Sequence, residues 1–239
     1  MREFTSDRGS SLVEMLISTL IGGIVMVSIL DLYVQTSYGT QTSSSTTDMQ
    51  TQVKASMDFM VKELRLVYGL PTITSTVSAK DTIRFTRVED SGYSSGGNSL
   101  TTLSNTSKAW KTNHFASSVS GSYTVSIQVG KSVGEAHPIA SNTSTALTLS
   151  DTWSTIPDTS SLFLISRTKT FSRTADNMLR YQIGTGPPNV IATNITSLSF
   201  TQTDPWSLVI TVTGRTAHPD PNTGAFRYFT MSDTARKRN

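Results

Sequence analysis

The chain has 239 residues, a net charge of +3 and no cysteine, and only 15% of its residues are charged. The absence of cysteine excludes disulfides, thiolate metal sites and a cysteine nucleophile. Nucleic-acid-binding proteins usually cluster their Lys and Arg side chains, whereas the one dense basic run here is the short segment 236–238. Ser and Thr supply 74 residues. Because Thr favours strands and Ser favours turns, this composition predicts a β-rich protein with polar loops.

The N-terminal segment is the most apolar part of the chain. Residues 15–30 contain no charged side chain, and the apolar stretch extends over residues 10–34 with only Glu14 and Asp31 as interruptions. About 20 apolar residues are enough to cross the hydrocarbon core of a bilayer. The apolar side chains surround the whole helix, which favours lipid or a tightly packed helical bundle over a place in a soluble core.

The flanking charges predict the orientation of this helix. Arg2 and Arg8 precede it, and no Lys or Arg follows until Lys54. The positive-inside rule therefore places the N-terminus in the cytoplasm and the rest of the chain on the other side. A secretory signal peptide and a plain signal anchor are alternatives. The residues after the apolar run are a poor match to the cleavage site of a signal peptide. Neither a signal peptide nor a plain anchor explains why Glu14 lies inside an apolar helix.

The residues around Glu14 form a compound motif. A short charged leader ends in Gly9, the apolar helix begins at once with Ser10, and Glu14 is the fifth residue after the glycine. This motif resembles the processing site of type IV prepilins and pseudopilins, although Ser10 stands where that family usually has Phe. The resemblance implies that a prepilin peptidase removes residues 1–9 and methylates the new N-terminus at Ser10. It also implies that Glu14 is needed for ordered filament assembly.

Elementary electrostatics agrees with a role for Glu14 in assembly. Cleavage would leave an ammonium group at Ser10, about 6 Å along the helix axis from Glu14. A neighbouring subunit shifted by about one helical turn would bring its own ammonium next to this carboxylate. At a separation of 4 Å the attraction is about 4 kcal/mol before the cost of desolvation. Such a pair would help to set the axial stagger between the helices of neighbouring subunits.

Two segments follow the apolar helix. Residues 36–47 are mostly Ser and Thr and have poor helix propensity, so the sequence leaves open whether the helix continues through them or gives way to a bent or frayed spacer. Residues 48–68 regain a helical period, and Gly69 and Pro71 are expected to end this second helix. Its apolar stripe should pack on a sheet, and it consists of Met49, Val53, Met57, Met60, Leu64 and Val67. The end of this segment resembles the same region of PilW-type minor pilins and J-type minor pseudopilins.

From residue 72 onward the pattern predicts β-structure. Alternating apolar and polar residues indicate strands at 82–88, 123–129, 146–149, 162–171, 178–182, 195–203, 208–212 and 226–231. Turns are expected at Asp204-Pro205 and at residues 220–224, and residues 89–113 are expected to form a mobile surface loop. Residues 189–204 and the last strand again resemble the PilW type.

The sequence contains one literal match to a catalytic motif. Residues 130–134 read GKSVG, which fits G-x-S-x-G with Ser132 as the nucleophile. A nucleophile elbow must join a strand to a helix, and the residues after this motif do not resemble a helix. We therefore do not expect an enzyme, and a membrane-tethered hydrolase that uses Ser132 is the less favoured alternative.

Metal-binding patterns are weak. The three histidines, His114, His137 and His218, lie in predicted loops without metal-ligand spacing, and we expect surface positions for them. Calcium remains an alternative, because some pseudopilins bind it, but its possible ligands Asp204, Asp220 and Asp233 do not follow a calcium-loop spacing. No cofactor is expected.

Together these features predict an α+β, pilin-like fold in which a long N-terminal helix, half in the membrane and half amphipathic, packs on a β-rich head. The expected parts are a leader (1–9), a membrane and assembly helix (10–34), a spacer with an amphipathic helix (35–70) and a head (71–239). The resemblance to prepilins implies that a chain of this organisation is a minor pilin in the inner membrane with a periplasmic head, later in a cell-surface filament. The alternative is a minor pseudopilin of J type in a type II secretion system.

The expected partners follow from the resemblance. They are a prepilin peptidase, other pilin or pseudopilin subunits and the inner-membrane assembly platform. DNA or a surface ligand is a weaker candidate, for which residues 89–113 and the basic tail would be the contacts.

Overall fold

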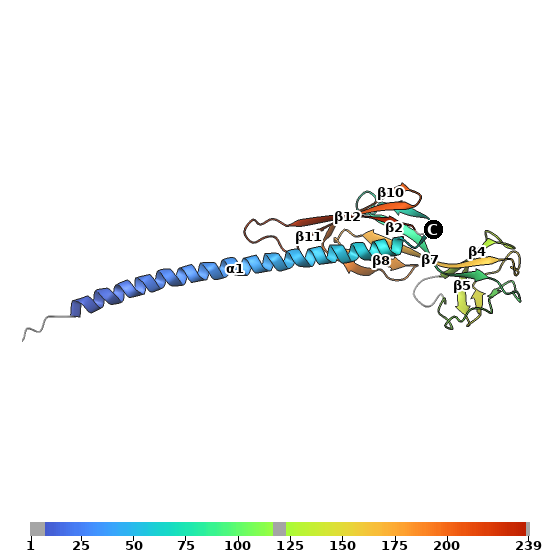
Figure 1. Cartoon of the computed structure of the whole chain (residues 1–239), viewed down its shortest axis with the longest axis horizontal. Coiled ribbons are helices and arrows are strands. Elements are labelled where there is room, and N and C mark those ends of the chain that lie inside the picture. The colour runs from blue at the N-terminus through green and yellow to red at the C-terminus, as the bar shows by residue number, and fades with distance from the viewer. Residues whose placement is uncertain (1–7, 117–122, 238–239) are drawn as a thin grey trace, which may run out of the picture.

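The computed structural model describes the backbone of residues 8–116 and 123–237, and the side chains of these residues from Leu12 onward. Within these residues lies one α-helix, α1 (Arg8–Leu64). Its 57 residues reach about 85 Å at 1.5 Å per residue. The N-terminal half of α1 projects alone, and its C-terminal half lies against the strands of a head (Figure 1). The predicted α+β, pilin-like arrangement is confirmed.

The helix is continuous through residues 36–47, which excludes a bent or frayed spacer there. Hydroxyl groups that could compete with the helix instead bond to carbonyl oxygens of the preceding turn. Thr40 Oγ1 donates to the Thr36 carbonyl at 2.9 Å, and Thr46 Oγ1 donates to the Thr42 carbonyl at 2.8 Å. Because these hydroxyls are satisfied inside the helix, a helix that is already nucleated on both sides propagates through the segment despite its low propensity.

The end of α1 also differs from the prediction. The helix ends at Leu64, and strand β1 (Val67–Thr74) follows almost at once. Gly69 and Pro71 therefore lie within β1 and do not terminate the helix. Tyr68 pairs with Thr86 and Thr72 pairs with Arg84, so β1 bulges between Tyr68 and Thr72. Gly69 has a φ of +73° in this bulge, a conformation that suits glycine.

The described strands form two antiparallel sheets. The nine-stranded sheet consists of β1, β2 (Thr82–Tyr93), β3 (Thr102–Ser104), β4 (Tyr123–Val129), β5 (Ala136–Asn142), β6 (Ala146–Leu149), β7 (Leu162–Arg173), β8 (Leu179–Ile183) and β9 (Asn189–Ala192). Its main path is β1-β2-β7-β4-β5-β6-β3, and β8 joins β7 to β9. The three-stranded sheet has the order β10 (Ile195–Asp204), β11 (Ser207–Arg215), β12 (Tyr228–Arg236).

Each predicted strand overlaps an observed strand, and 123–129 and 146–149 match β4 and β6 at both ends. The two turns are also confirmed, since Asp204 pairs with Ser207 and the Gly224 N–H donates to the Asp220 carbonyl at 2.7 Å. The expected loop at residues 89–113 is wrong. Its first residues continue β2, and it contains β3, whose Leu103 is fully buried.

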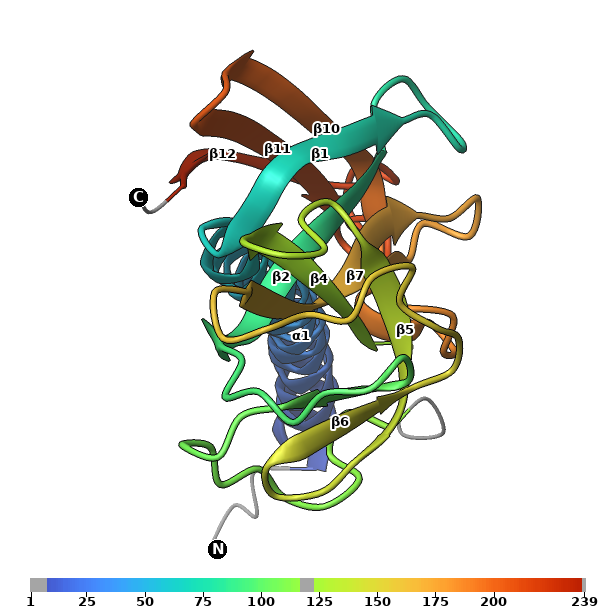
Figure 2. The same cartoon turned by 90° about the vertical axis from the view of Figure 1, so that its right-hand side faces the viewer.

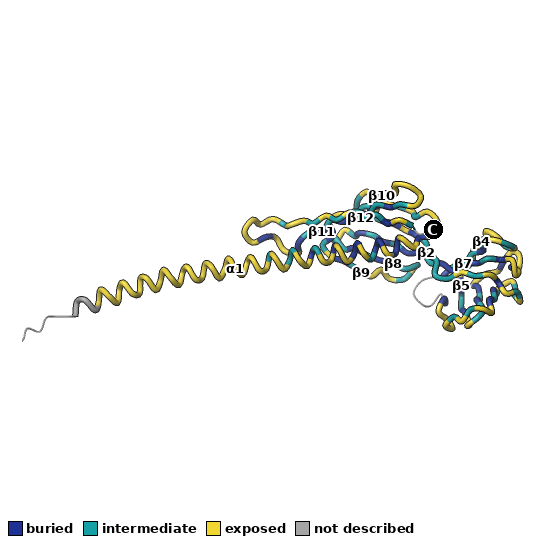
Figure 3. The backbone as a smooth tube through the Cα atoms, in the orientation of Figure 1, coloured by how far each residue is buried: buried dark blue, intermediate teal, exposed yellow. Residues whose placement is uncertain are grey.

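The head contains two hydrophobic cores. The helix-side core lies between α1, the three-stranded sheet and β1, β2, β7 and β8, and includes Val53, Met57, Phe171, Phe200 and Ile210. All six residues of the predicted apolar stripe are buried, although Val67 belongs to β1 and not to the helix. Figure 3 shows this burial along the C-terminal half of α1.

The distal core lies at the end of the head farthest from the helix N-terminus, under β4, β5 and β6 (Figure 2). It is built around Leu103, Ile139, Trp153 and Phe163. Strands β2 and β7, each 12 residues long, run through both parts of the head. Phe163 at one end of β7 belongs to the distal core, and Phe171 near the other end belongs to the helix-side core.

Candidate anchoring and assembly helix

The N-terminal half of α1 is an apolar rod with no cover from the rest of the chain. Every residue from 12 to 41 is exposed, which corresponds to about 45 Å of helix. Figure 3 shows this half as exposed along its whole length. The segment is long and apolar enough to cross a membrane, and no residue of its most apolar window is buried. The helix is therefore compatible with a single membrane anchor.

Several polar side chains of this rod form hydrogen bonds within it. Thr19 Oγ1 lies 3.0 Å from the Met15 carbonyl and 2.9 Å from the Leu16 carbonyl, and Ser28 Oγ donates to the Ile24 carbonyl at 2.9 Å. Such bonds lower the cost of placing hydroxyl groups in hydrocarbon. Glu14, in contrast, makes no hydrogen bond or ion pair with any residue that the structure describes, and its side chain is exposed. It is a carboxylate in an apolar surface that lacks a partner within the described chain.

The carboxyl end of the rod has the features of a membrane interface. Tyr33 and Tyr38 are exposed there, and Tyr is enriched where a helix leaves the bilayer. Asp31 accepts a hydrogen bond from Gln35 Nε2 at 3.1 Å. The first partly covered residue of the helix is Thr42, about 12 Å beyond Val34 along the axis. The head therefore begins well clear of the apolar segment.

The two residues of the predicted cleavage site lie in the first turn of α1. The backbone is helical from Arg8, so Gly9 and Ser10 are helical, but their side chains are outside the described residues, as is the leader from 1 to 7. Gly22 and Gly23 lie within the rod, where an added Cβ would meet no atom within 4 Å. This leaves room for close approach of another helix at these positions.

The rod is fixed to the head because α1 lies directly on β11. A Cβ on Gly214 would lie 2.7 Å from Val53 Cγ2 and 3.4 Å from Met49 Cγ, so only glycine allows this approach. The side chain of Gln52 adds a polar contact, because its Oε1 accepts a hydrogen bond from the Thr193 N–H at 3.1 Å. Close packing at this point holds the orientation of the helix on the sheet.

A buried ion network fixes the last turns of α1. Glu63 accepts from Arg87 Nη1 of β2 and from Lys169 Nζ of β7, each at 2.7 Å. Glu89 joins the network through Arg167 at 2.9 Å and Lys169 at 3.6 Å. Burial alone would raise the pKa of Glu63, but the bonds and charges of Lys169 and Arg87 outweigh it and hold that pKa below its ordinary value. Sequence reasoning missed this network, because Glu63 looked like a solvent-facing residue beside the apolar stripe.

Ser132 lies in a turn and not in a nucleophile elbow. Residues 130–134 connect β4 to β5, so the strand is followed by another strand where an elbow requires a helix. Ser132 has a φ of +68°, and its hydroxyl donates to the Thr155 carbonyl. In this arrangement the hydroxyl is bonded to a carbonyl oxygen and not to a general base.

The candidate metal ligands are dispersed. His114 and His218 are exposed as predicted, but His137 lies in β5 and is half-buried, so its placement in a loop was wrong. Asp204 and Asp220 lie at opposite ends of β11, and Asp220 accepts from Arg227 Nε at 3.1 Å. In the described part of the chain, no three His, Asp or Glu side chains are grouped as metal ligands.

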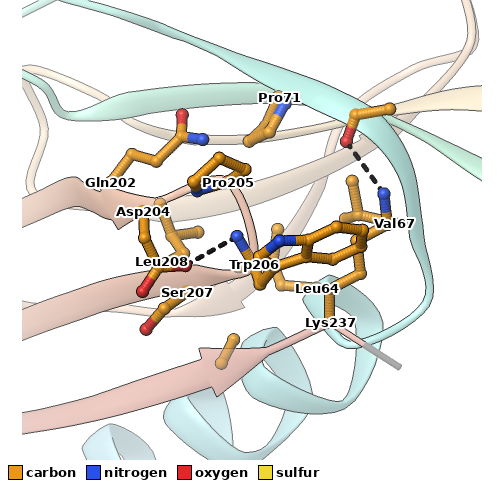
Figure 4. A pocket seen from close by; sticks show the side chains of 12 residues that line it. Leu64, Val67, Pro71, Gln202, Asp204, Pro205, Trp206, Ser207, Leu208 and Lys237 are labelled. Atoms are coloured by element: carbon orange, nitrogen blue, oxygen red, sulfur yellow. Dashed lines mark hydrogen bonds between the residues drawn. The ribbon is translucent and has the colours of Figure 1, made fainter. Parts of the chain in front are cut away.

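A small hollow near the C-terminus was also not predicted. It lies between β1, the end of α1 and the β10–β11 turn, and Leu64, Val67, Pro71, Pro205 and Trp206 line it (Figure 4). Its volume of about 20 Å³ is room for roughly one water molecule. The tail residue Lys237 also lines the hollow, with its ammonium 5.2 Å above the Trp206 ring. This part of the basic tail is therefore packed against the head and not free in solvent.

The comparisons with known proteins give no named relative. No family model, no curated protein and no solved structure matches the chain. The architecture itself carries the information: a long apolar N-terminal helix is continuous with an amphipathic half that packs on an antiparallel β head. This arrangement is pilin-like.

Proposed function

We propose that the chain is a structural, non-enzymatic subunit of the minor pilin type. It would be built into a type IV pilus and would aid the initiation, assembly, or tip or surface function of the filament. The observation that carries this proposal is the exposed rod of residues 12–41, which is continuous with the packed half of α1. A helix with this exposure needs lipid or other helices around it.

The proposed pathway begins in the inner membrane, with the N-terminus in the cytoplasm and the head in the periplasm. A prepilin peptidase cuts between Gly9 and Ser10 and methylates Ser10. The assembly platform then moves the subunit from lipid into a bundle of pilin helices. Glu14 has no partner in its own described chain, so the N-terminal ammonium of a neighbouring subunit pairs with it. An unpaired charge in an apolar bundle is strongly disfavoured, so this pairing sets the axial stagger between the helices of neighbouring subunits.

The same rod would serve a J-type minor pseudopilin in a type II secretion system. The two functions differ in the neighbouring subunits and not in the chemistry of the helix. Covalent crosslinking in cells followed by identification of the crosslinked subunits distinguishes them. Pilus subunits support the proposal, and pseudopilins replace it with the secretion function.

The test of the proposal has two steps. After co-expression with a prepilin peptidase, the intact mass should correspond to loss of residues 1–9 and gain of one methyl group. In piliated cells, Glu14→Ala should be cleaved normally but should be depleted from sheared filaments. Asp31→Ala is the matched control, because it removes the other carboxylate of the apolar segment and should leave incorporation unchanged. An uncut chain, or normal incorporation of Glu14→Ala, would contradict the proposal.

A further inference from the structure

An imidazole lies between two carboxylates at the distal end of the head. His137 is on β5, and its Nδ1 lies 2.8 Å from Asp151 Oδ1 while its Nε2 lies 3.2 Å from Glu135 Oε2. The ring also packs edge-on against Trp153, with centroids 4.4 Å apart. The His137 side chain is 13% exposed and Trp153 is 1% exposed. The three polar groups therefore lie above a buried indole of the distal core.

Both contacts of this imidazole require a proton. A neutral imidazole has one N–H donor and one acceptor nitrogen, and an ionised carboxylate can only accept. With neutral His137, one ring nitrogen would face a carboxylate oxygen with no proton between them. When both carboxylates are ionised, only the doubly protonated ring donates to Asp151 and to Glu135 at the same time, so the geometry fits the imidazolium form.

This cluster joins two segments that are far apart in the sequence. Glu135 closes the β4–β5 turn, and Asp151 belongs to the segment between β6 and β7. Glu135 Oε2 also accepts the Ser154 N–H at 2.7 Å, and Ser132 Oγ donates to the Thr155 carbonyl. The turn and the segment 151–155 are thus held together across His137. Trp153 of this segment is buried beneath the His137 ring.

No other charge competes at this position. Among the described residues, Glu135 and Asp151 are the charged groups within ion-pair distance of the ring. The residue opposite His137 on β4 is Val125, and its neighbours Thr124 and Ser126 are also uncharged. The protonation state of His137 therefore decides whether both bonds form.

We propose that Glu135, His137 and Asp151 form a pH-responsive clasp that holds the segment 151–155 against the β4–β5 turn when His137 is protonated. An ordinary imidazole changes its charge between about pH 5 and pH 8. The clasp is closed when His137 is protonated and loses one of its two bonds when the ring is neutral. The Ser154 N–H is the main cause that keeps the pKa of Glu135 below its ordinary value, so this carboxylate stays ionised when His137 is protonated. The clasp is independent of the proposed filament role.

Hydrogen exchange of the full chain in detergent micelles tests the clasp. The readout is the exchange of backbone amides in a peptide that covers residues 151–155, compared between wild type and His137→Gln at the same pH. At pH 5.5 the variant should exchange up to about fivefold faster, as expected for a partly exposed ion pair. At pH 8.5 the difference should shrink, because neutral His137 keeps only one of the two bonds.

Two further variants complete the test. His218→Gln removes an exposed histidine elsewhere in the head and should match wild type at both pH values. Asp151→Asn removes one carboxylate and should reproduce the effect of His137→Gln at pH 5.5. Agreement between the two variants shows that the faster exchange of His137→Gln does not come from a local packing defect. Equal exchange of wild type and both clasp variants at pH 5.5, or a difference of the same size at pH 8.5, would overturn the proposal.

Discussion

Glu63 on α1 and Lys169 on β7 form a buried ion pair with Oε2 and Nζ 2.7 Å apart, and the Lys169 side chain is only 2% exposed. The two residues are separated by 106 positions in the chain. The pair therefore connects the last turns of the helix to the strand that runs through both cores of the head. Because both charges are shielded from water, neither can lose its partner without a large cost in folding free energy.

Removal of Lys169 should destabilise the head. Lys169→Met leaves Glu63 with Arg87 alone in a buried site, and we expect the free energy of unfolding to fall by about 3 kcal/mol. Denaturant titration of the full chain in mild detergent, followed by circular dichroism, measures this loss. The matched control is Lys62→Met, which removes an exposed lysine from the same turns of α1 and should change the free energy by less than about 0.5 kcal/mol. Equal effects of the two variants would contradict a buried network.

The ionisation of Glu63 predicts a pH dependence of stability. Its pKa in the folded state lies below the ordinary value of 4.5, so the folded chain holds the charged form more strongly than the unfolded chain. The resulting stabilisation is fully present above the ordinary pKa and is lost as the pH falls through the lower folded pKa. The difference in unfolding free energy between wild type and Glu63→Gln should therefore shrink on acidification below about pH 4.5.

The exposed Asp58→Asn on the same helix is the control for this titration. This variant removes an exposed carboxylate and should change the free energy of unfolding by less than about 0.5 kcal/mol. If the Glu63→Gln difference is independent of pH, the ion pair with Lys169 does not stabilise the folded state in the way the geometry indicates.

The contact between α1 and β11 predicts the effect of a single methyl group. Gly214→Ala places a Cβ 2.7 Å from Val53 Cγ2, and overpacking of this kind costs about 1–3 kcal/mol. Val53→Ala removes the opposing methyl groups, so the double variant should be more stable than the sum of the two single changes predicts. Thermal unfolding of the four proteins measures this coupling. Strictly additive effects would show that the two residues do not touch.

The continuity of α1 can be measured directly, because the chain has no cysteine and introduced cysteines are unique labels. Spin labels at Tyr33→Cys and Thr47→Cys flank the Ser- and Thr-rich segment on exposed positions. A continuous helix places the two Cα atoms about 21 Å apart, with a narrow distance distribution in pulsed electron paramagnetic resonance. A second pair across the packed helix, at Lys54 and Lys62, gives the width expected for a rigid segment. A broad distance distribution or a shorter mean distance for the first pair would indicate a bent or frayed segment instead of a continuous helix.

Sequence periodicity predicted those helices and strands whose side chains are buried on one face. The apolar stripe that begins at Met49 and the alternation around Ile210 each identify one buried face, and both are correct. Propensity failed at residues 36–47, because the back-bonded hydroxyls of Thr40 and Thr46 are a property of the formed helix and not of the isolated residues. Strand β5 was missed because Pro138 and Asn142 are poor strand residues that a local pattern rejects.

For the candidate site, the sequence was sufficient for the apolar rod, because the rod depends on local composition, whereas the assembly role of Glu14 stays a prediction. The attachment of the rod to the head was not predictable in this way. Glu63, Arg87 and Lys169 look like ordinary surface charges until the fold brings three distant segments together. The His137 clasp likewise requires the contact between two connections that no local pattern specifies.

Strands β2 and β7 have a mechanical consequence. They are antiparallel neighbours over eleven paired residues, from Thr82 with Ser172 to Tyr93 with Leu162. If the distal end of one strand is pulled while the helix-side end of the other is held, these hydrogen bonds are loaded together in shear, and not one after another as in peeling. Lys169 then passes this load from β7 to Glu63 on the helix. Tension therefore has a direct route from the far end of the head to the apolar rod.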